Sequence, residues 1–429
     1  MNHLATLYQQ FISCGKVSTD TRIDIEGAIF FALSGENFNG NQFARDAIDK
    51  GAALAVIDQK EYKTDERFLL VDNTLETLQD LARHHRSRLK CEFVGITGSN
   101  GKTTTKELLS NVLSTEKKVS FTKGNLNNHI GVPLTILRTL KDTEIAVIEM
   151  GANHIGEIAL LCDIAKPQTG IITNIGKAHL EGFGSLEGVI KAKSELYDYL
   201  KSYDGMAIVN EDDPLLMELS KGLTRIIYGS SSELFTTAIL TSNPFLNFRW
   251  TYQDQVFECK TKLYGKYNMD NIRAAIATGL HFGISPENIN LAITNYQPDN
   301  NRSQLVDTAS NKIILDAYNA NPVSMLHAID NFKEFQAENP WLLLGDMFEL
   351  GDNAAEEHAK IIQLIQEKGF KNVMLVGKEF FKLKSANSYL NFKDLKDAEN
   401  HLIKHPIKNA QLLVKGSRGV QLEKLLKFL

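Results

Sequence analysis

The residues best suited to chemistry lie in one short glycine-rich segment, TGSNGKTTT, at residues 97–105. An apolar run precedes it and apolar residues at helical spacing follow it, which is the pattern of a strand, a tight loop and a helix N-terminus. In such a loop backbone N–H groups bind phosphate, a lysine (Lys102) reaches the outer phosphates and a hydroxyl (Thr103) ligates Mg²⁺. The segment therefore predicts a nucleotide site made of Gly98, Ser99, Asn100, Gly101, Lys102, Thr103 and Thr104.

The spacing of its glycines distinguishes this loop from the common P-loop. Two residues separate Gly98 from Gly101, whereas four residues separate the glycines of the usual motif. The shortened form is unlike the loops of ordinary kinases and GTPases. The alternative, a glycine-rich turn that binds nothing, is disfavoured by the strand–loop–helix context.

Three charged side chains near other predicted elements are candidates for metal binding. Glu149 ends an apolar strand, so we expect its carboxylate at the same sheet edge as the phosphate loop, where it can hold Mg²⁺ directly or through water. The alternative for Glu149 is a helix-capping or ion-paired carboxylate. His179 follows another strand end and Lys193 lies in a helical stretch. Taken alone, the first is typical of a structural histidine and the second of a solvated lysine face.

Further polar residues surround the predicted site. Asn268 and Asn271 precede a helix of small residues, where their amides read a nucleotide base or cap the helix, and both alternatives stay open. Asp316 begins a loop, DAYNANP, with more hydrogen-bonding side chains than a turn requires. Arg302 stands alone at a predicted domain junction, where it either neutralises transferring phosphate or is an ordinary surface arginine.

The last predicted strand leads into the segment KGSRG at residues 415–419. Its glycine-flanked backbone, one hydroxyl and two cations are suited to binding a carboxylate. The candidate residues for this anion pocket are Lys415, Ser417 and Arg418.

Strand and helix patterns alternate along the chain, which indicates an α/β protein. Its 429 residues correspond to three domains at roughly 150 residues each. Residues 1–90 predict a small α/β domain with buried strands at 28–33 and 52–57 and a helix at 43–50. A polar, basic stretch at residues 84–90 closes this domain.

Residues 91–298 predict a middle domain built on a parallel sheet. Its strands are short apolar runs that end in a polar or small residue, namely 93–96, 145–149, 170–174, 206–210 and 225–228. Alternating apolar and polar residues at 245–252 and 256–263 predict an antiparallel hairpin added to the sheet edge.

Residues 299–429 predict a second doubly wound, Rossmann-like sheet. A polar segment with a proline, residues 295–301, is the expected linker. The strand candidates are 312–315, 341–344, 373–376 and 412–414, and helical patterns separate them.

The composition disfavours several classes of protein. The formal net charge is −5 with both signs interspersed, which argues against nucleic acid or a membrane surface as the main partner and favours a small molecule. The four cysteines are scattered without a CxxC pair, as expected for reduced thiols. No apolar run approaches the roughly 18 residues of a membrane span and no signal peptide begins the chain, so we expect a cytoplasmic protein.

Together these motifs resemble those of the Mur ligase family over nearly the whole chain. The segments STDTR at 18–22 and GAIFFALSG at 27–35 resemble the family's UDP-binding N-terminal domain, and the shortened loop is similar to its ATP loop. Five segments resemble the branch of the family that adds D-Ala-D-Ala: GNLNNHIGVPLT at 124–135, EMGAN at 149–153, DAYNANP at 316–322, GDMFELG at 345–351 and KGSRG at 415–419.

The resemblance implies Mg²⁺ and ATP as cofactors. It assigns the metal to Thr103, Glu149, His179 and Lys193, the last of which several Mur ligases carry as a carbamate. A bare ammonium repels a metal ion, whereas a carbamate offers an anionic oxygen ligand. Besides the loop, the positions that match contacts to ATP are Asn271, Arg302 and Asp316.

The resemblance also implies where the other substrates bind. The UDP-muramoyl-tripeptide is expected at Thr21, Arg22, Asn127 and Asn128. The dipeptide D-Ala-D-Ala is expected at Lys415, Ser417 and Arg418. ATP would convert the terminal carboxyl of the tripeptide to an acyl phosphate, which the dipeptide amine then attacks. A monomer is expected.

One departure from the family pattern is visible, because Tyr267 stands where the family often has a histidine before Asn268. Three competing functions remain. The diaminopimelate-adding ligases are disfavoured because the Asp-Asn-Pro-Arg motif is absent and Val323 follows Pro322. Folylpolyglutamate synthases are disfavoured by the UDP-type N-terminal segment. A nucleotide-binding module without activity is disfavoured by the joint presence of Glu149, His179 and Lys193.

Overall fold

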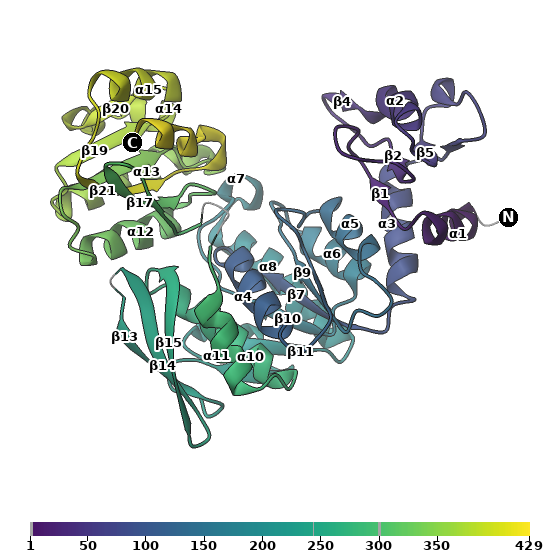
Figure 1. Cartoon of the computed structure of the whole chain (residues 1–429), viewed down its shortest axis with the longest axis horizontal. Helices are drawn as coiled ribbons and strands as arrows, with labels where there is room; N and C mark the ends of the chain where they lie inside the picture. Colours follow the sequence, from purple (N-terminus) through teal and green to yellow (C-terminus); the bar gives the residue numbers. More distant parts are fainter. Residues whose placement is uncertain (1–2, 243, 299–301) are drawn as a thin grey trace.

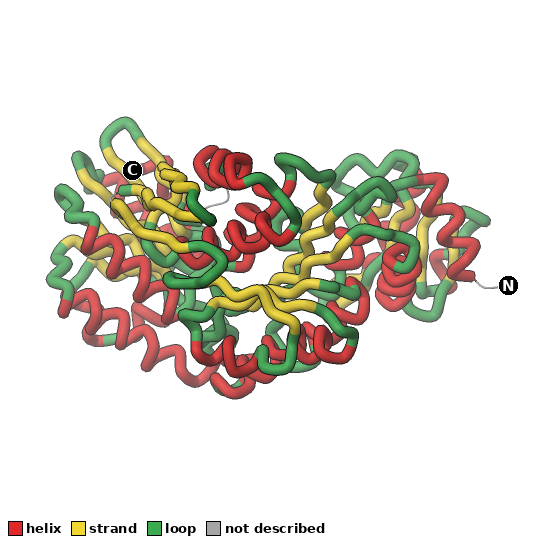
Figure 2. The backbone as a smooth tube through the Cα atoms, turned by 90° about the horizontal axis from the view of Figure 1, so that it is seen from below, coloured by secondary structure: helices red, strands yellow, loops and turns green. Residues whose placement is uncertain are grey.

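Three units, each built on its own sheet, follow one another along the computed structural model of the chain (Figure 1). The structure describes residues 3–242, 244–298 and 302–429. The two termini lie in the units at opposite ends, and the view from below in Figure 2 shows the same order. No helix among the described residues is long and apolar enough to cross a membrane.

The N-terminal unit is a parallel four-stranded sheet with helices and a small ribbon around it. In sheet order its strands are β1 (Val17–Ser18), β2 (Ile29–Phe31), β5 (Leu54–Ile57) and β6 (Phe68–Leu70). The ribbon pairs β3 (Ser34–Gly35) with β4 (Phe38–Asn39). The helical segments are α1 (His3–Cys14), η1 (Gly40–Phe43), α2 (Ala44–Asp49), η2 (Lys60–Tyr62) and α3 (Thr74–Arg86). The two strands and the helix predicted here are confirmed.

The stretch predicted to close the first domain, residues 84–90, begins inside a helix. Residues 84–86 form the last turn of α3, and His85 and Arg86 are buried. Arg86 donates hydrogen bonds to the carbonyls of Ala165 (2.6 Å) and Lys166 (2.9 Å) in the middle unit. These polar residues therefore attach α3 to the next unit, because a buried guanidinium must find acceptors.

The core of the N-terminal unit continues into that of the middle unit. Leu78 and Leu81 of α3 belong to one cluster of buried residues with Val132 and Ile158 of the middle unit. The contact between α3 and the middle unit is apolar on both sides, so the hydrophobic effect stabilises it. The predicted boundary at residue 90 therefore falls within a continuous core.

The middle unit contains a parallel six-stranded sheet. In sheet order the strands are β12 (Thr224–Tyr228), β11 (Met206–Asn210), β10 (Thr169–Ile172), β7 (Glu92–Thr97), β9 (Ile145–Glu149) and β8 (Val119–Phe121). The helices around it are α4 (Lys102–Leu113), α5 (Gly131–Leu137), α6 (Glu157–Ala165), α7 (Leu180–Phe183), α8 (Leu186–Ser202), α9 (Pro214–Leu219), α10 (Asn268–His281) and α11 (Pro286–Asn295). All five predicted strands are confirmed, and β8 was not predicted.

The predicted hairpin exists, but its position differs from the prediction. β14 (Phe245–Tyr252) and β15 (Gln255–Tyr264) pair antiparallel, and β13 (Thr236–Thr241) adds a third strand. They form a sheet of their own that is not hydrogen-bonded to the six-stranded sheet. Its buried face, with Phe248 and Trp250, packs in one cluster with Ile289 of α11. The apolar residues that alternate along its strands therefore cover an apolar helix face, and the three strands do not extend the parallel sheet.

The C-terminal unit contains a second six-stranded sheet. In sheet order its strands are β16 (Gln304–Asp307), β17 (Asn311–Asp316), β21 (Ala410–Lys415), β18 (Pro340–Gly345), β19 (Asn372–Val376) and β20 (Leu390–Phe392). Only β16 pairs antiparallel. The helical segments are α12 (Pro322–Glu334), η3 (Gly351–Asn353), α13 (Ala354–Glu367), α14 (Lys378–Lys382), η4 (Lys384–Ser388), α15 (Leu395–Lys404), η5 (Arg418–Val420) and η6 (Leu422–Phe428).

The four strands predicted for the C-terminal unit are confirmed, and the edge strands β16 and β20 were not predicted. Of the predicted linker, Asn295 ends α11, and residues 299–301 lie outside the described residues. The short strands at both edges carry few apolar residues, so periodicity in the sequence does not reveal them.

Candidate active site

The glycine-rich loop joins β7 to α4 as predicted. Gly98 has a φ of +141° and Gly101 a φ of +82°, which side chains rarely tolerate. A Cβ at Gly98 would lie 2.0 Å from the Thr173 hydroxyl, and one at Gly101 would lie 2.4 Å from Oδ1 of Asn271. The two glycines thus allow the loop to turn tightly against its neighbours just before α4.

The Lys102 ammonium folds back over this loop. Its Nζ donates to the carbonyls of Gly98 (2.6 Å) and Ser99 (3.3 Å), so it lies inside the loop although part of the side chain reaches the surface. Burial lowers the pKa of Lys102 to about 8. The carboxylates of Glu149 and Glu349 oppose that decrease, while the Arg302 guanidinium adds to it. Charged groups from the loop, from β9 and from the C-terminal unit therefore act on one small volume.

Polar contacts hold the rest of the loop against the segment after β10. The Ser99 hydroxyl donates to the Gly176 carbonyl (2.9 Å), and the Asn100 N–H donates to Oδ1 of Asn174 (3.0 Å). The Thr173 hydroxyl in turn donates to the Asn100 carbonyl (2.6 Å). Both strands are parallel, so their carboxyl ends meet at one edge and fix the loop from two sides.

Glu149 lies beside the loop at this edge, 1% exposed. Its Oε1 accepts hydrogen bonds from the Thr103 hydroxyl (3.1 Å) and from Nδ2 of Asn127 (2.8 Å). Its Oε2 is buried without a hydrogen bond among the described residues, and the ammonium of Lys106 is 3.5 Å away. A buried carboxylate oxygen that accepts no hydrogen bond, next to a hydroxyl, offers oxygen ligands that suit a hard cation such as Mg²⁺.

Lys106 was missed by the sequence analysis. It is 1% exposed and lies one turn after Thr103 on the same face of α4. That spacing of three residues was the available signal, because residues i and i+3 of a helix are neighbours.

Lys193 is not part of a solvated face, so that alternative is wrong. The residue is 1% exposed, and its Nζ lies 3.4 Å from the Ala152 carbonyl and 5.2 Å from the centre of the Phe183 ring. Burial lowers the pKa of Lys193 to about 7, and the Lys102 cation adds to the decrease. Lys193 therefore belongs to the same electrostatic environment as the loop, with its amine neutral in part near pH 7.

His179 precedes α7 with a left-handed backbone, at a φ of +52°. Its Nδ1 lies 2.5 Å from Oε2 of Glu349, which belongs to the C-terminal unit. The contact with His179 lowers the pKa of the Glu349 carboxyl. Glu349 lies in the segment 345–351 quoted above, but nothing in its spacing indicated a contact with His179.

Asn268 and Asn271 lie in the first turn of α10, and neither side chain caps the helix. Oδ1 of Asn271 accepts from the Thr105 hydroxyl (3.0 Å), and its Nδ2 donates to Oδ1 of Asn268 (2.9 Å). Asn268 in turn donates to the Tyr264 carbonyl (2.8 Å). Of the two alternatives, helix capping is therefore wrong for both residues. Tyr267, the departure from the family pattern, shares a hydrogen bond of 2.6 Å with the Ser303 hydroxyl.

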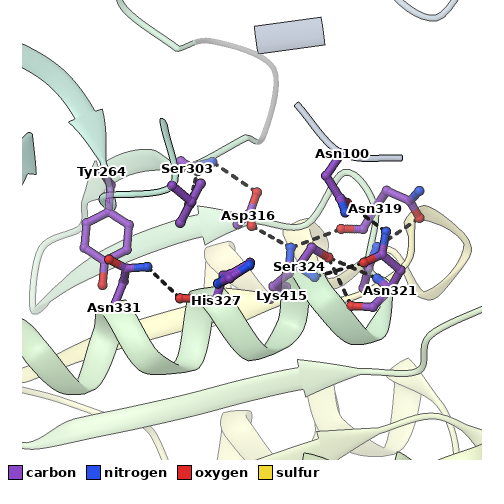
Figure 3. A network of polar contacts seen from close by, with 12 residues as sticks. Asn100, Tyr264, Ser303, Asp316, Asn319, Asn321, Ser324, His327, Asn331 and Lys415 are labelled. Carbon is purple, nitrogen blue, oxygen red and sulfur yellow. Dashed lines mark hydrogen bonds and ion pairs between the residues drawn. The ribbon is translucent and has the colours of Figure 1, made fainter. Parts of the chain in front are cut away.

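The C-terminal unit adds a polar network that reaches the loop (Figure 3). The Lys415 ammonium is 2.6 Å from Oδ2 of Asp316 and donates to the Asn319 carbonyl (3.2 Å). Asn321 caps α12 with its Oδ1 and, through Nδ2, donates to Oδ1 of Asn100 (2.8 Å). Asp316 and the phosphate loop are thus brought together by the docking of the two units.

Two arginines flank the ring of Tyr318. The guanidinium carbon of Arg302 is 3.9 Å from the ring centre and that of Arg418 is 5.4 Å away. Nε of Arg302 is buried and has no hydrogen-bond partner among the described residues. Arg302 is therefore no ordinary surface arginine, and the ring holds both cations on one side of the junction.

The predicted dipeptide residues differ in exposure. Lys415 is 2% exposed and paired with Asp316, and Ser417 is 3% exposed with its hydroxyl accepting from the Phe348 N–H (2.9 Å). Arg418 is exposed. The structure therefore does not bring the three side chains together as free groups, and Arg418 is the one that remains open to a ligand.

The residues predicted for the UDP substrate are in two places. Thr21 and Arg22 lie on the N-terminal unit, where Arg22 is exposed and makes a two-pronged contact (2.9 and 2.8 Å) with Asp20, whose pKa it lowers to about 2. Asn127 instead contacts Glu149, as described above. Asn128 accepts from the Gly131 N–H (2.9 Å) at the start of α5.

Comparison with known proteins finds relatives along the whole chain. Family models described as the Mur ligase family catalytic domain, the Mur ligase middle domain and the Mur ligase glutamate ligase domain match residues 17–86, 96–279 and 301–418. The UDP-N-acetylmuramoyl-tripeptide–D-alanyl-D-alanine ligase of Bacillus subtilis (strain 168) is 36% identical, covering 98% of this chain and 94% of the relative.

Solved structures agree with these matches. A crystal structure of MurF from Acinetobacter baumannii superposes with a TM-score of 0.85 at 30% identity, over 96% of this chain and 92% of that chain. The crystal structure of MurF ligase from Thermotoga maritima in complex with ADP has a TM-score of 0.82 at 27% identity, over 96% of both chains.

Proposed function

The chain belongs to the Mur ligase family, and on this premise we propose that it joins D-Ala-D-Ala to the terminal carboxyl of UDP-N-acetylmuramoyl-tripeptide, with ATP converted to ADP and phosphate. One observation carries the proposal. The shortened phosphate loop, a buried carboxylate at Glu149 and the cations Lys102 and Lys193 lie at one sheet edge, against which the C-terminal unit docks through Asn321 and Glu349. This reaction belongs to the synthesis of peptidoglycan precursors in the cytoplasm.

ATP is bound by residues 98–104, with Asn271, Arg302 and Asp316 around it. The support is the tight turn that Gly98 and Gly101 allow between β7 and α4, and the Lys102 ammonium that lies inside this loop. Mg²⁺ is held by Thr103 and Glu149, for which the support is Oε2 of Glu149, a buried oxygen that accepts no hydrogen bond among the described residues. When bound, Mg²⁺ neutralises charge on the phosphates. His179 and Lys193 are the ligands proposed for a second ion.

Lys193 serves as a carbamate in this proposal. The neutral amine attacks CO₂, a C–N bond forms, and one amine proton leaves to solvent, which replaces a cation by an anion. A pKa of about 7 supports this step, because it leaves a large share of the amine neutral near neutral pH. Burial behind Phe183 protects the product from water.

The reaction begins with two anions that repel each other. Lys102 and Arg302 reduce that repulsion so that an oxygen of the tripeptide carboxylate attacks the γ-phosphorus, and ADP leaves with the bridging oxygen. The amine of D-Ala-D-Ala then attacks the carbonyl carbon of the acyl phosphate. The tetrahedral intermediate loses phosphate and the amine loses a proton, which gives the amide. Positioning of the three substrates supplies much of the rate increase.

The remaining substrate contacts are shared among the three units. Thr21 and Arg22 bind the UDP end, and Asn127 and Asn128 lie along the path of the muramoyl peptide. Arg418 binds the dipeptide carboxylate, while Lys415 and Ser417 hold the segment that presents it. The units proposed for these tasks are residues 1–90, 91–298 and 299–429, acting in a monomer, and docking of the last excludes water from the acyl phosphate.

A phosphate-release assay tests this function. The purified protein is given ATP and Mg²⁺ with one substrate set at a time: a UDP-muramoyl-tripeptide that ends in diaminopimelate or lysine, with and without D-Ala-D-Ala; the dipeptide precursor with free diaminopimelate; or a folate substrate with glutamate. We expect release with at least one tripeptide and only when D-Ala-D-Ala is present. Release with the dipeptide precursor and free diaminopimelate, or with folate and glutamate, would assign a sister ligase instead. ATP binding without release in any mixture would identify a module without activity.

A further inference from the structure

The ring of Tyr318, in the segment after β17, contacts two cations that the proposed function gives to different substrates. The guanidinium carbon of Arg302 is 3.9 Å from the centre of this ring, and that of Arg418 is 5.4 Å away. Both distances are within the roughly 6 Å over which an aromatic face attracts a cation. Arg302 is proposed to act on the transferring phosphate and Arg418 on the dipeptide carboxylate. One half-buried ring therefore touches a cation from each of two proposed subsites.

The backbone next to Arg302 is fixed, but one buried donor of its side chain has no acceptor. Ser303, the next residue, has a left-handed φ of +52° and is 6% exposed. Its N–H donates to Oδ1 of Asp316 (3.2 Å), and its hydroxyl shares a hydrogen bond of 2.6 Å with the Tyr267 hydroxyl (Figure 3). Nε of Arg302 is buried without a hydrogen-bond partner among the described residues. Because a buried donor without an acceptor is unfavourable, this side chain is suited to an anionic ligand.

Arg418 is attached to its unit in a similar manner. Ser417, the residue before it, donates its N–H to the Asp346 carbonyl (3.0 Å), and its hydroxyl accepts from the Phe348 N–H (2.9 Å). Arg418 itself is exposed at the start of η5. An exposed arginine loses side-chain entropy when a ligand orders it, and a contact that already restricts its rotamers reduces that loss. The ring of Tyr318 supplies such a contact.

From this geometry we propose that Tyr318 is a positioning residue for both arginines, so that one ring sets the places of the cations for the transferring phosphate and for the dipeptide carboxylate. The roles of Arg302 and Arg418 come from the proposed function, on which this inference rests. Two guanidinium groups beside one ring repel each other, and attraction to the negative face of the ring offsets part of that repulsion. The ring thus holds two cations close together before their anionic partners bind.

The test removes the ring and then restores it. Tyr318→Leu and Tyr318→Met keep an apolar side chain without a ring, whereas Tyr318→Phe keeps the ring and loses only the hydroxyl. Tyr389→Leu is the matched control, because Tyr389 is another half-buried tyrosine of the C-terminal unit and packs against the core of that unit. Phosphate release at varied substrate concentrations gives kcat and the KM for each substrate, and thermal unfolding checks that each variant is folded.

We expect Tyr318→Leu and Tyr318→Met to lower kcat about 10-fold and to raise the KM for D-Ala-D-Ala about fivefold, since each arginine loses one cation–π contact. The KM for the UDP-muramoyl-tripeptide should not change, because its proposed contacts lie elsewhere. Tyr318→Phe should recover most of both losses, and Tyr389→Leu should match the wild type in kcat and in every KM.

The two arginines allow the two effects to be separated. In an Arg302→Ala background, Tyr318→Leu should no longer lower kcat but should still raise the KM for D-Ala-D-Ala. In an Arg418→Ala background, Tyr318→Leu should still lower kcat but should no longer raise that KM. A general loss of packing would produce neither pattern, because it would act alike in the three backgrounds.

Three results would overturn the inference: equal effects of Tyr318→Leu in all three backgrounds, a Tyr318→Phe protein as impaired as Tyr318→Leu, or wild-type kinetics in Tyr318→Leu. Failure of the proposed function would appear separately, as a wild-type protein that releases no phosphate with any tripeptide.

Discussion

The carboxyl edges of the two six-stranded sheets both bury lysines, but they balance the charge differently. In the C-terminal unit Lys415 is 2% exposed and has its own carboxylate, Asp316, at 2.6 Å. In the middle unit the Glu149 carboxylate acts on Lys102 and is 3.5 Å from the Lys106 ammonium, while Lys193 is affected by the Lys102 cation and by the more distant carboxylates of Glu157 and Glu195. Among the described residues, neither Lys102 nor Lys193 has an ion pair within 4.0 Å. The buried lysine of the first edge is thus neutralised by its own carboxylate, whereas Lys102 and Lys193 are buried without an ion-pair partner.

Because Lys102 and Lys193 are buried without an ion-pair partner, their charged forms destabilise the middle unit. An ionised group taken from water without a partner shifts its pKa toward the neutral form, as the values of about 8 for Lys102 and about 7 for Lys193 indicate. A structural role alone would favour the paired arrangement of Lys415. Unbalanced cations at a glycine-rich loop are instead suited to a ligand that brings negative charge, such as ATP.

The largest expected effect comes from removing a cation of the unbalanced edge. Lys102→Met should lower kcat for phosphate release by about 10³-fold, because the developing charge on the phosphates loses its nearest cation. The fold should be retained, since the change removes a charge that is not paired. Phosphate release and circular dichroism measure the two properties. A Lys102→Met protein that makes ADP at the wild-type rate would remove the loop from the proposed mechanism.

The comparison also predicts opposite changes in stability. Lys415→Met leaves Asp316 without its partner and should lower the free energy of unfolding by about 3 kcal/mol. Lys193→Met removes a buried cation and should raise the midpoint of thermal unfolding at pH 6.5 in buffer freed of CO₂. Below pH 7 Lys193 is protonated in both the folded and the unfolded state, so burial of its charge lowers the free energy of unfolding by the full amount.

Between pH 7 and about 10.5 the unfolded chain keeps the Lys193 proton while the folded protein has released it, so wild-type stability rises with pH. The advantage of Lys193→Met should therefore shrink across this window and disappear above it. Differential scanning calorimetry at several pH values measures the effect. Equal destabilisation by Lys193→Met and Lys415→Met at pH 6.5 would show that the two edges do not differ as proposed.

The smallest expected effect concerns the contact that links the two edges. Asn321→Ser keeps a side-chain cap for α12 but no longer reaches Oδ1 of Asn100. Loss of one net hydrogen bond of about 1 kcal/mol should raise the KM for ATP about fivefold. Asn321→Ala, which also loses the cap, serves as the matched variant for stability. If Asn321→Ser changes neither the KM nor kcat, the contact with Asn100 plays no part in docking.

The strands that carry the site were predictable because buried parallel strands are unbroken apolar runs. β9 and β11 have the bounds that the sequence indicated, and the glycine-rich loop lies between β7 and α4 as expected. The hairpin was recognised but assigned to the wrong sheet, because alternation shows that one face is buried and not which element buries it. β8 and β16 were missed since neither is apolar enough to stand out.

Residue roles were less predictable than elements. The burial of Lys193 could not be read from its helix, because a lysine on either face has the same local spacing. Asn127 was predicted to bind the UDP substrate, and its hydrogen bond to Glu149 was not foreseen. Lys106 could have been found from its helical spacing to Thr103, whereas Glu349 could not, since it reaches His179 from another unit.

By itself the sequence determined the strand–loop–helix at residues 97–105, the α/β class and the family, because these depend on residue types at short spacing. Only the tertiary structure decided which charges share an environment. Lys102, Glu149, Lys193 and Glu349 come from distant segments, and the strength of a charge depends on burial and on neighbours within a few ångströms. Such neighbours are set by how sheets and units dock, and docking leaves no periodic pattern in the chain.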